Sequence, residues 1–211
     1  MSKCGECGIY ACRSGQMEKA PEHCPMRQDA EVYKEAEEEY RKPEIANLAL
    51  NSAITESAGY RVWTRLEEII FFSRKAGFNK LGVAFCIGLR KEAAEFVRIL
   101  KQAGFEVESV ACKNGSMPKE LIGVTEEQKL SPGQFEPMCN PVAQARLLNR
   151  AKTDFNILLG LCVGHDSMFI KFSEAPVTVL AVKDRVLAHN PLGAIYASHY
   201  YAAKLNTWKK E

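Results

Sequence analysis

The sequence predicts an α/β fold: a Rossmann-like parallel sheet of about four strands with flanking helices, preceded by a small cysteine-rich segment and N-terminal helices. Two observations predict the sheet. Apolar runs and helical periodicity alternate four times, and Ile157, Leu158 and Leu159 form a continuous apolar run, as in a strand buried on both faces. A third observation marks the N-terminus, where four cysteines stand among few apolar residues. We therefore expect three regions, which are residues 1–28, 29–77 and 78–211.

Composition and charge exclude several classes of protein. A chain of 211 residues is long enough for one core of ordinary size. Its net charge of +2, with both signs intermixed, argues against a nucleic-acid partner. Its apolar runs are too short to span a bilayer, and the first residues contain no apolar signal segment. We expect a cytoplasmic protein with neither a nucleic-acid partner nor a membrane partner.

Eight cysteines define the chemistry that the chain offers. In a reducing cytosol structural disulfides are disfavoured, and grouped cysteines more often bind metal or carry redox chemistry. The eight residues form two sets. The N-terminal set consists of Cys4, Cys7, Cys12 and Cys24. The second set is spread through the rest of the chain and consists of Cys86, Cys112, Cys139 and Cys162.

The N-terminal set has the spacing Cys-x2-Cys-x4-Cys-x11-Cys. Four thiolates can hold a zinc ion or an iron–sulfur cluster, and metal binding would supply folding energy that so few apolar residues cannot. The alternative is a disordered tail. A zinc ribbon prefers two Cys-x2-Cys knuckles, of which Cys4 and Cys7 form only one, whereas Cys24-Pro25 is similar to the end of bacterial ferredoxin motifs. The sequence therefore favours iron–sulfur over zinc in a metal-binding segment at 1–28, with His23 outside the ligand set.

Three helices are predicted in the region 29–77. They run from Asp29 to Arg41, from Pro43 to about Ser57, and from about Tyr60 to Ala76. Asp29 is placed to cap the first helix, Pro43 can open the second, and Gly77 ends the third.

Strands and helices alternate through the region 78–211. The expected strands are 80–86, 105–112, 155–162 and 177–182, and the expected helices are 89–103, 142–151, 165–172 and 191–205. The loop 116–137, with a short helix near 118–122, is of a length that is usually functional. We expect Leu147 and Leu148 to face inward, and the stretch His165-Asp166-Ser167 to supply the cap of its helix.

The cysteines of the second set stand at predicted strand ends. Cys86, Cys112 and Cys162 each end a strand, and Cys139 ends the long loop. We expect the first and third strands to be neighbours, with the second and fourth outside them, so that the winding reverses between Cys86 and Cys162. Because neighbouring strands lie about 4.8 Å apart, the thiols should meet at one edge of the sheet.

Four thiols at one edge can bind an iron–sulfur cluster, whose negative charge is favoured by nearby helix N-termini and glycine turns. The sequence therefore predicts a second four-cysteine centre. Two alternatives stay open. The cysteines can be buried side chains that act as small apolar residues, or Cys86 and Cys162 can form a redox disulfide.

The sequence identifies no catalytic residue. One expectation is that His165 forms a hydrogen bond or acts as a proton donor beside the second centre. The other is that it is a structural histidine that hydrogen-bonds to the backbone. Five more residues can face the same edge, although most are expected to be solvated: Lys171, Lys183, Asp184, Arg185 and His189. Neither a dinucleotide fingerprint nor a Walker motif follows the strand 80–86, and no Ser-His-Asp order is evident.

Several motifs together resemble a known family. They are the N-terminal Cys-x2-Cys-x4-Cys, the segment Leu161–Ser167 and the segment Ala175–Leu180. The resemblance is to an uncharacterised family of cysteine-rich predicted metal-binding proteins of anaerobic bacteria and archaea, and it covers nearly the whole chain. It implies metal binding and an anaerobic cytoplasm, without an established reaction. The architecture is also similar, by analogy only, to Rossmann-like domains of carbon monoxide dehydrogenases and hybrid-cluster proteins, whose strand-end cysteines hold iron–sulfur clusters.

These observations lead to two hypotheses. The first is an iron–sulfur protein with two four-cysteine centres, each expected to be [4Fe-4S], which acts in electron transfer or in redox activation of a small molecule. Its partner would be a redox protein or a small molecule. The second hypothesis is a binding or regulatory module in which zinc holds the N-terminal segment, and Cys112 and Cys139 line a small-ligand pocket without redox chemistry.

Overall fold

The computed structural model describes residues 2–207. Met1 and the last four residues of the predicted region 78–211 lie outside the described residues. The chain divides into two compact units, Met1–Arg61 and Val62–Glu211.

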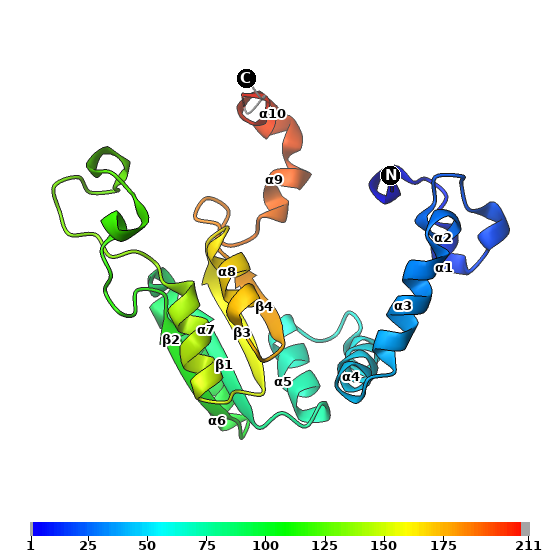
Figure 1. Ribbon diagram of the computed structural model, residues 1–211, viewed down its shortest axis with the longest axis horizontal. Coiled ribbons are helices and arrows are strands. Elements are labelled where there is room, and N and C mark those ends of the chain that lie inside the picture. The colour runs from blue at the N-terminus through cyan, green and yellow to red at the C-terminus, as the bar shows by residue number, and fades with distance from the viewer. Residues whose placement is uncertain (1, 208–211) are drawn as a thin grey trace. The chain divides into compact units, whose positions relative to one another are not determined.

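The N-terminal unit is helical and has almost no core at its cysteine-rich end (Figure 1, blue). Its elements are η1 (Cys4–Glu6), α1 (Ala11–Ser14), η2 (Met17–Lys19), α2 (Pro25–Gln28), α3 (Ala30–Tyr40) and α4 (Pro43–Gly59), where η denotes a 3₁₀ helix. Among residues 2–28 the buried side chains are those of Ala11 and Ala20. Two alanines bury too little apolar surface to offset the entropy of ordering this segment.

The second unit is built on a four-stranded parallel sheet (Figure 1). Its strands are β1 (Lys80–Phe85), β2 (Glu106–Ala111), β3 (Phe155–Leu161) and β4 (Val177–Val182). The order is β2-β1-β3-β4, so the predicted α/β fold is confirmed, as is the expected pairing of the first and third strands. Every residue of β3 is buried, which explains the apolar run Ile157–Leu159 at its centre.

Helices cover both faces of this sheet. They are α5 (Arg65–Lys75), α6 (Arg90–Gln102), α7 (Pro141–Arg150) and α8 (His165–Phe172). Two further helices, α9 (Leu192–Tyr196) and α10 (Ser198–Asn206), follow β4 in the chain. Short 3₁₀ turns lie at η3 (Ile87–Leu89), η4 (Lys119–Ile122) and η5 (Glu126–Gln128). On one face, α5 and α6 bury Ile69 and Phe96 against β1 and β3. On the other, α7 and α8 bury Leu148 and Phe169.

Three features differ from the sequence-based expectations. The third helix begins at Arg65, not near Tyr60, because Thr64 and Glu67 form a capping box at that point. This helix packs in the core of the sheet unit, so the division of the chain falls at residues 61/62 rather than at 77/78. The predicted helix 191–205 is two helices, because Ala197 leaves the helical conformation between them (φ −99°, ψ 27°).

Among the described helices, none combines the length and apolar character that a membrane crossing needs.

Substitution of two neighbouring leucines of α7 can show which face of this helix stabilises the fold. Leu148 is fully buried, whereas Leu147, expected to face inward, is 42% exposed because it lies off the apolar stripe. We predict that Leu148→Ala lowers the free energy of unfolding by about 2–5 kcal/mol, since it leaves a cavity. The matched Leu147→Ala should cost about 0.5 kcal/mol or less. Urea unfolding followed by circular dichroism measures both, and equal losses would contradict the packing.

Candidate metal centres

All four N-terminal cysteines line one small pocket of about 40 Å³. Cys4 lies in η1, Cys7 follows it, Cys12 lies in α1, and Cys24 immediately precedes α2. The other residues that line the pocket are Lys3, Tyr10, Ala11, Pro21, His23 and Pro25. The structure therefore brings together the complete set that the spacing suggested, and it places His23 beside the thiols.

Backbone N–H groups point at one of these sulfurs. The amide of Tyr10 donates to Cys7 Sγ at 3.4 Å, and Tyr10 holds an unusual left-handed conformation (φ 50°). Hydrogen bonds from the amides of Tyr10 and Ile9 lower the pKa of the Cys7 thiol. A turn that presents amides to a sulfur favours the thiolate, which is the form that binds metal.

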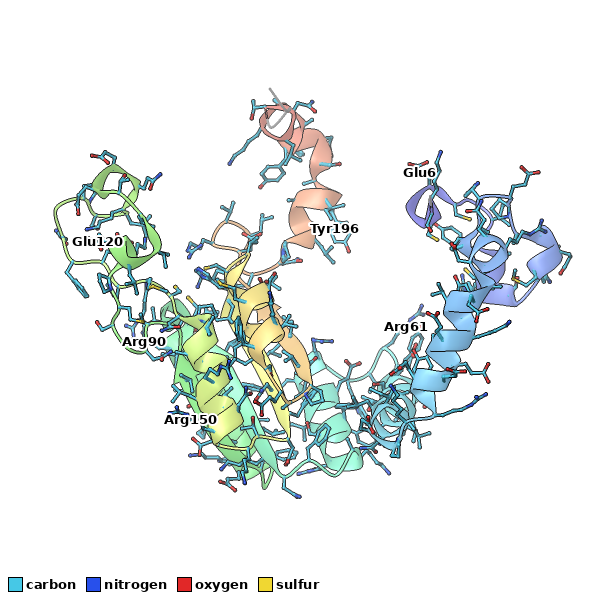
Figure 2. The ribbon with its side chains drawn as sticks, in the orientation of Figure 1. Glu6, Arg61, Arg90, Glu120, Arg150 and Tyr196 are labelled. Atoms are coloured by element: carbon cyan, nitrogen blue, oxygen red, sulfur yellow. The ribbon has the colours of Figure 1, made fainter. Side chains whose placement is uncertain are left out.

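The second set lies at the carboxyl edge of the sheet, as expected. Cys86 and Cys112 directly follow β1 and β2, and Cys162 directly follows β3. Backbone hydrogen bonds continue past the strand ends, because Cys86 N donates to Leu159 O (3.1 Å) and Cys112 N donates to Phe85 O (2.9 Å). Figure 2 shows Arg90, the first residue of α6, at this edge and Arg150, the last residue of α7, at the opposite end of the sheet.

Cys139 joins the edge from the long loop. The amide of the next residue, Asn140, donates to Cys112 O at 2.7 Å, and the Sγ atoms of Cys139 and Cys112 are 3.7 Å apart. The amide of Ile87 donates to Cys112 Sγ at 3.3 Å. Cys86 and Cys112 are buried, at 7% and 2% exposure, whereas Cys139 and Cys162 are half-buried.

These thiols share their protons unequally. Hydrogen bonds with Cys139 and Cys86, together with burial, raise the pKa of Cys112. The same contacts with Cys112 lower the pKa of Cys86 to about 5 and that of Cys139 to about 6. In the metal-free site Cys112 is therefore the thiol that resists deprotonation most, and it lies between two thiols that ionise more readily.

Cations surround the thiols. The Lys183 ammonium hydrogen-bonds Cys86 and lowers its pKa further, while the charges of Lys113 and His165 lower the pKa of Cys139. Arg185 Nη2 donates to Cys162 Sγ at 3.3 Å, and this contact raises the pKa of Arg185. The edge is therefore electropositive, which favours thiolates and bound anionic groups.

Lys183 and Arg185 are two of the five residues that the sequence allows at this edge, most of which are expected to be solvated, and the structure places both beside thiols. Lys183 follows β4 directly, and its amide donates to Leu161 O at 3.1 Å. The loop after it is held by Asp184, whose carboxylate accepts from the amides of Val186 and Leu187. In the sequence, only the position of these two residues indicates such a role, because both follow a predicted strand that ends at the same edge of the sheet as the cysteines.

Glycines make room for this arrangement. Gly160 has a φ of 70° within β3, where the pairing with β4 shifts register, and a side chain there would meet Leu89 Cδ1 at 2.1 Å. At Gly88 a Cβ would lie 3.2 Å from Lys183 Nζ and 3.8 Å from Cys86 Sγ. The absence of a side chain at Gly88 thus lets the ammonium approach the sulfur.

Gln144 is a further residue that sequence reasoning missed. Its side chain is fully buried, and Nε2 donates to Phe85 O (3.2 Å) and Val110 O (2.7 Å), which joins the ends of β1 and β2 beneath the cysteines. Its Oε1 has no hydrogen-bond partner within the described chain. A buried amide that bridges two strand ends fixes the spacing of the thiols above them.

The predicted capping role of residues 165–167 is wrong. Gly164 occupies the N-cap position with a φ of 83°, which His165 and Asp166 follow as helical residues. Asp166 instead accepts from the amide of Ser167. The charge of His165 lowers the pKa of Cys139.

Within residues 2–207 no group of three or more Cys, His, Asp or Glu side chains is arranged to hold a single metal ion. Each thiolate of an iron–sulfur cluster binds a different iron, so the ligands of a cluster need not all reach one point. Cysteine sulfurs as donors suit iron–sulfur clusters and zinc. The donor set fits such a group by its chemistry at both locations.

Comparisons with other proteins give the family context. A family described as "Protein of unknown function (DUF1847)" matches residues 24–180, which is most of the chain. An uncharacterized protein of Methanocaldococcus jannaschii is 43% identical over 198 residues, which cover 94% of this chain and 95% of that relative. These matches confirm the expected resemblance to an uncharacterised family. No solved structure matches the chain, and the likeness to carbon monoxide dehydrogenases and hybrid-cluster proteins stays an analogy.

The proton distribution at the edge predicts a pH profile for thiol reactivity. In metal-free protein, alkylation of Cys139 by iodoacetamide should rise between about pH 5 and 7 and then level off, because its thiolate is fully formed above its lowered pKa. An ordinary thiol, with a pKa near 8.5, keeps gaining reactivity to about pH 9. Cys112 should react slowly throughout. Peptide mass spectrometry gives the rates, with urea-unfolded chain as control, and a Cys139 rate still rising above about pH 8 would contradict the assignment.

Proposed function

Because the chain belongs to the DUF1847 family, whose description names no reaction, we propose its function from its own residues. We propose an iron–sulfur protein with two four-cysteine centres that acts in electron transfer or in redox activation of a small molecule. The observation that carries this proposal is the gathering of each set of four cysteines in one place, within a pocket for the first set and along one sheet edge for the second.

The N-terminal set supports a metal centre on energetic grounds. Its four sulfurs line a single pocket, and its segment has only two small buried alanines. Such a segment needs another source of folding energy, and thiolate–metal bonds supply it in small metal-binding domains. The backbone amides near Cys7 donate hydrogen bonds to its sulfur. Hydrogen bonds to a ligand sulfur also tune the reduction potential of an iron–sulfur cluster.

The strand-edge set supports a cluster on electrostatic grounds. A cluster bound by four thiolates is anionic, and Lys183, Arg185 and Lys113 place positive charge beside these sulfurs. When bound, the cluster would supply one-electron chemistry. The chain itself would bind it through the thiolates, shield Cys86 and Cys112 from water, and hold the guanidinium of Arg185 at Cys162.

The partner in this proposal is a redox protein or a small molecule, and the compartment is the cytoplasm. The compartment is supported by the thiols, because eight free cysteines are compatible with a reducing environment, where disulfides are rare. The half-buried Cys139 and Cys162 put the edge of the second centre within reach of a partner's surface.

The second candidate function is a zinc-stabilised binding or regulatory module. One observation favours it: Cys112 and Cys139 are free cysteines whose Sγ atoms lie 3.7 Å apart, so they can line a ligand site as a reduced pair. Zinc would then occupy the N-terminal pocket. Because zinc is redox-inert, metal analysis separates the two candidates.

Paired substitutions test the two-centre proposal. Protein purified without oxygen should contain about eight irons with matching sulfide if both centres are [4Fe-4S]. Cys162→Ala should remove the strand-edge signal and spare the N-terminal one, whereas Cys24→Ala should do the reverse. Iron and sulfide assays with EPR of the reduced protein measure both variants.

Each outcome has a defined meaning. Zinc without iron in the wild-type protein would favour the second candidate and remove the redox role. Full iron retention in Cys162→Ala would remove this residue from the ligand set of the second centre.

Metal removal should loosen the N-terminal segment and leave the sheet unit intact. We predict that stripping the metal speeds tryptic cleavage after Arg13 and Lys19, because residues 2–28 lack a core of their own. Cleavage after Lys80, in β1, should stay slow, since the sheet unit has its own hydrophobic clusters. Timed proteolysis with mass spectrometry measures both rates. Unchanged cleavage at Arg13 would show that the segment does not depend on metal.

A further inference from the structure

We infer that Lys183 and Arg185 stabilise the additional electron of a cluster at the strand edge, and so make a partly buried four-thiolate centre reducible. This inference rests on the proposed function, because it concerns the second of the two proposed centres. It assigns a role to two side chains that are not ligands.

Arg185 hydrogen-bonds one cysteine sulfur, and Lys183 lies close to another. Arg185 Nη2 donates to Cys162 Sγ at 3.3 Å. Lys183 is within hydrogen-bond reach of Cys86, and Gly88 leaves open the space through which its ammonium approaches. Cys86 and Cys162 follow the two central, adjacent strands, so the cations act on sulfurs at the ends of neighbouring strands.

The two charges are not neutralised by carboxylates. Within residues 2–207 neither cation forms an ion pair with Asp or Glu. The loop between Cys112 and Cys139 behaves differently, since Lys119 pairs with Glu136, and Lys129 pairs with Glu120 and Glu126. Asp184 stands between the two cations in sequence, but its carboxylate accepts from two backbone amides of its own loop.

Burial and charge oppose each other at this site. Reduction adds one electron to an already anionic cluster, and the burial of Cys86 and Cys112 works against more negative charge in a region of low dielectric. A cation a few Å from a ligand sulfur offsets this cost, as does an N–H hydrogen bond to the sulfur. Arg185 provides both effects.

The redox step is a simple electron transfer. One electron passes from a one-electron reductant, here dithionite in the test, to the iron of the cluster. No bond forms or breaks at Lys183 or Arg185, and no proton moves at either side chain. Their contribution is a shift in the equilibrium between the two cluster states.

Potentiometric titration followed by EPR tests the inference on iron-replete, full-length protein. Arg185→Met and Lys183→Met should each lower the equilibrium constant for reduction of the strand-edge centre by about tenfold, which for one electron is about 59 mV. The N-terminal centre is the internal reference and should not move. Lys171→Met, at an exposed position of α8, is the matched control and should leave both potentials unchanged.

The outcomes separate this inference from the proposed function. If the strand-edge centre is present at full iron content and its reduction potential is unchanged by both substitutions, the inference is overturned but the proposed function is not. A wild-type protein without a second cluster overturns both. If a Met variant fails to bind the cluster, Arg185→Gln and Lys183→Gln keep polar side chains without the charge, and unchanged potentials in these loaded variants overturn the inference.

Discussion

The register of the parallel sheet is the constraint on which the strand-edge site depends. Phe85 of β1 pairs with Ala111 of β2 on one side and with Leu159 of β3 on the other. The residues that follow, Cys86 and Cys112, are therefore level with each other. A slip of one residue would turn their side chains to the opposite faces of the sheet. Buried Gln144 bonds the carbonyls of Phe85 in β1 and Val110 in β2, and so opposes such a slip.

The two sets of cysteines are organised by different forces. At the strand edge, Cys86 and Cys112 belong to a hydrophobic cluster with Leu158 and Phe169, so packing places these thiols before any ligand arrives. In the N-terminal segment no comparable packing exists among residues 2–28. A bound metal would occupy a preformed site in one unit and would be part of the folding energy in the other.

The sequence was sufficient to predict those features that depend on hydrophobic periodicity and on glycines and prolines at the ends of elements. The strands, their order and the positions of Cys86, Cys112 and Cys162 at strand ends followed from apolar runs such as Ile157–Leu159 and from the glycines and prolines between them. The direction of Arg185 was not predictable in this way. It depends on backbone hydrogen bonds to Asp184 and on left-handed conformations at Ala188 and His189, which no local pattern of residue types specifies.

The protonation of the thiols links the strand edge to metal capture. Cys112 keeps its proton, and the Cys86 thiolate raises the pKa of Cys139, so mutual repulsion limits how many thiolates the metal-free edge can hold. The cations at Lys183 and Arg185 reduce this repulsion without removing it. A cluster that takes all four sulfurs as thiolates must therefore displace the proton of Cys112. Because ligand protonation competes with metal binding, the affinity of this edge should increase with pH, and the surrounding cations should extend binding to lower pH.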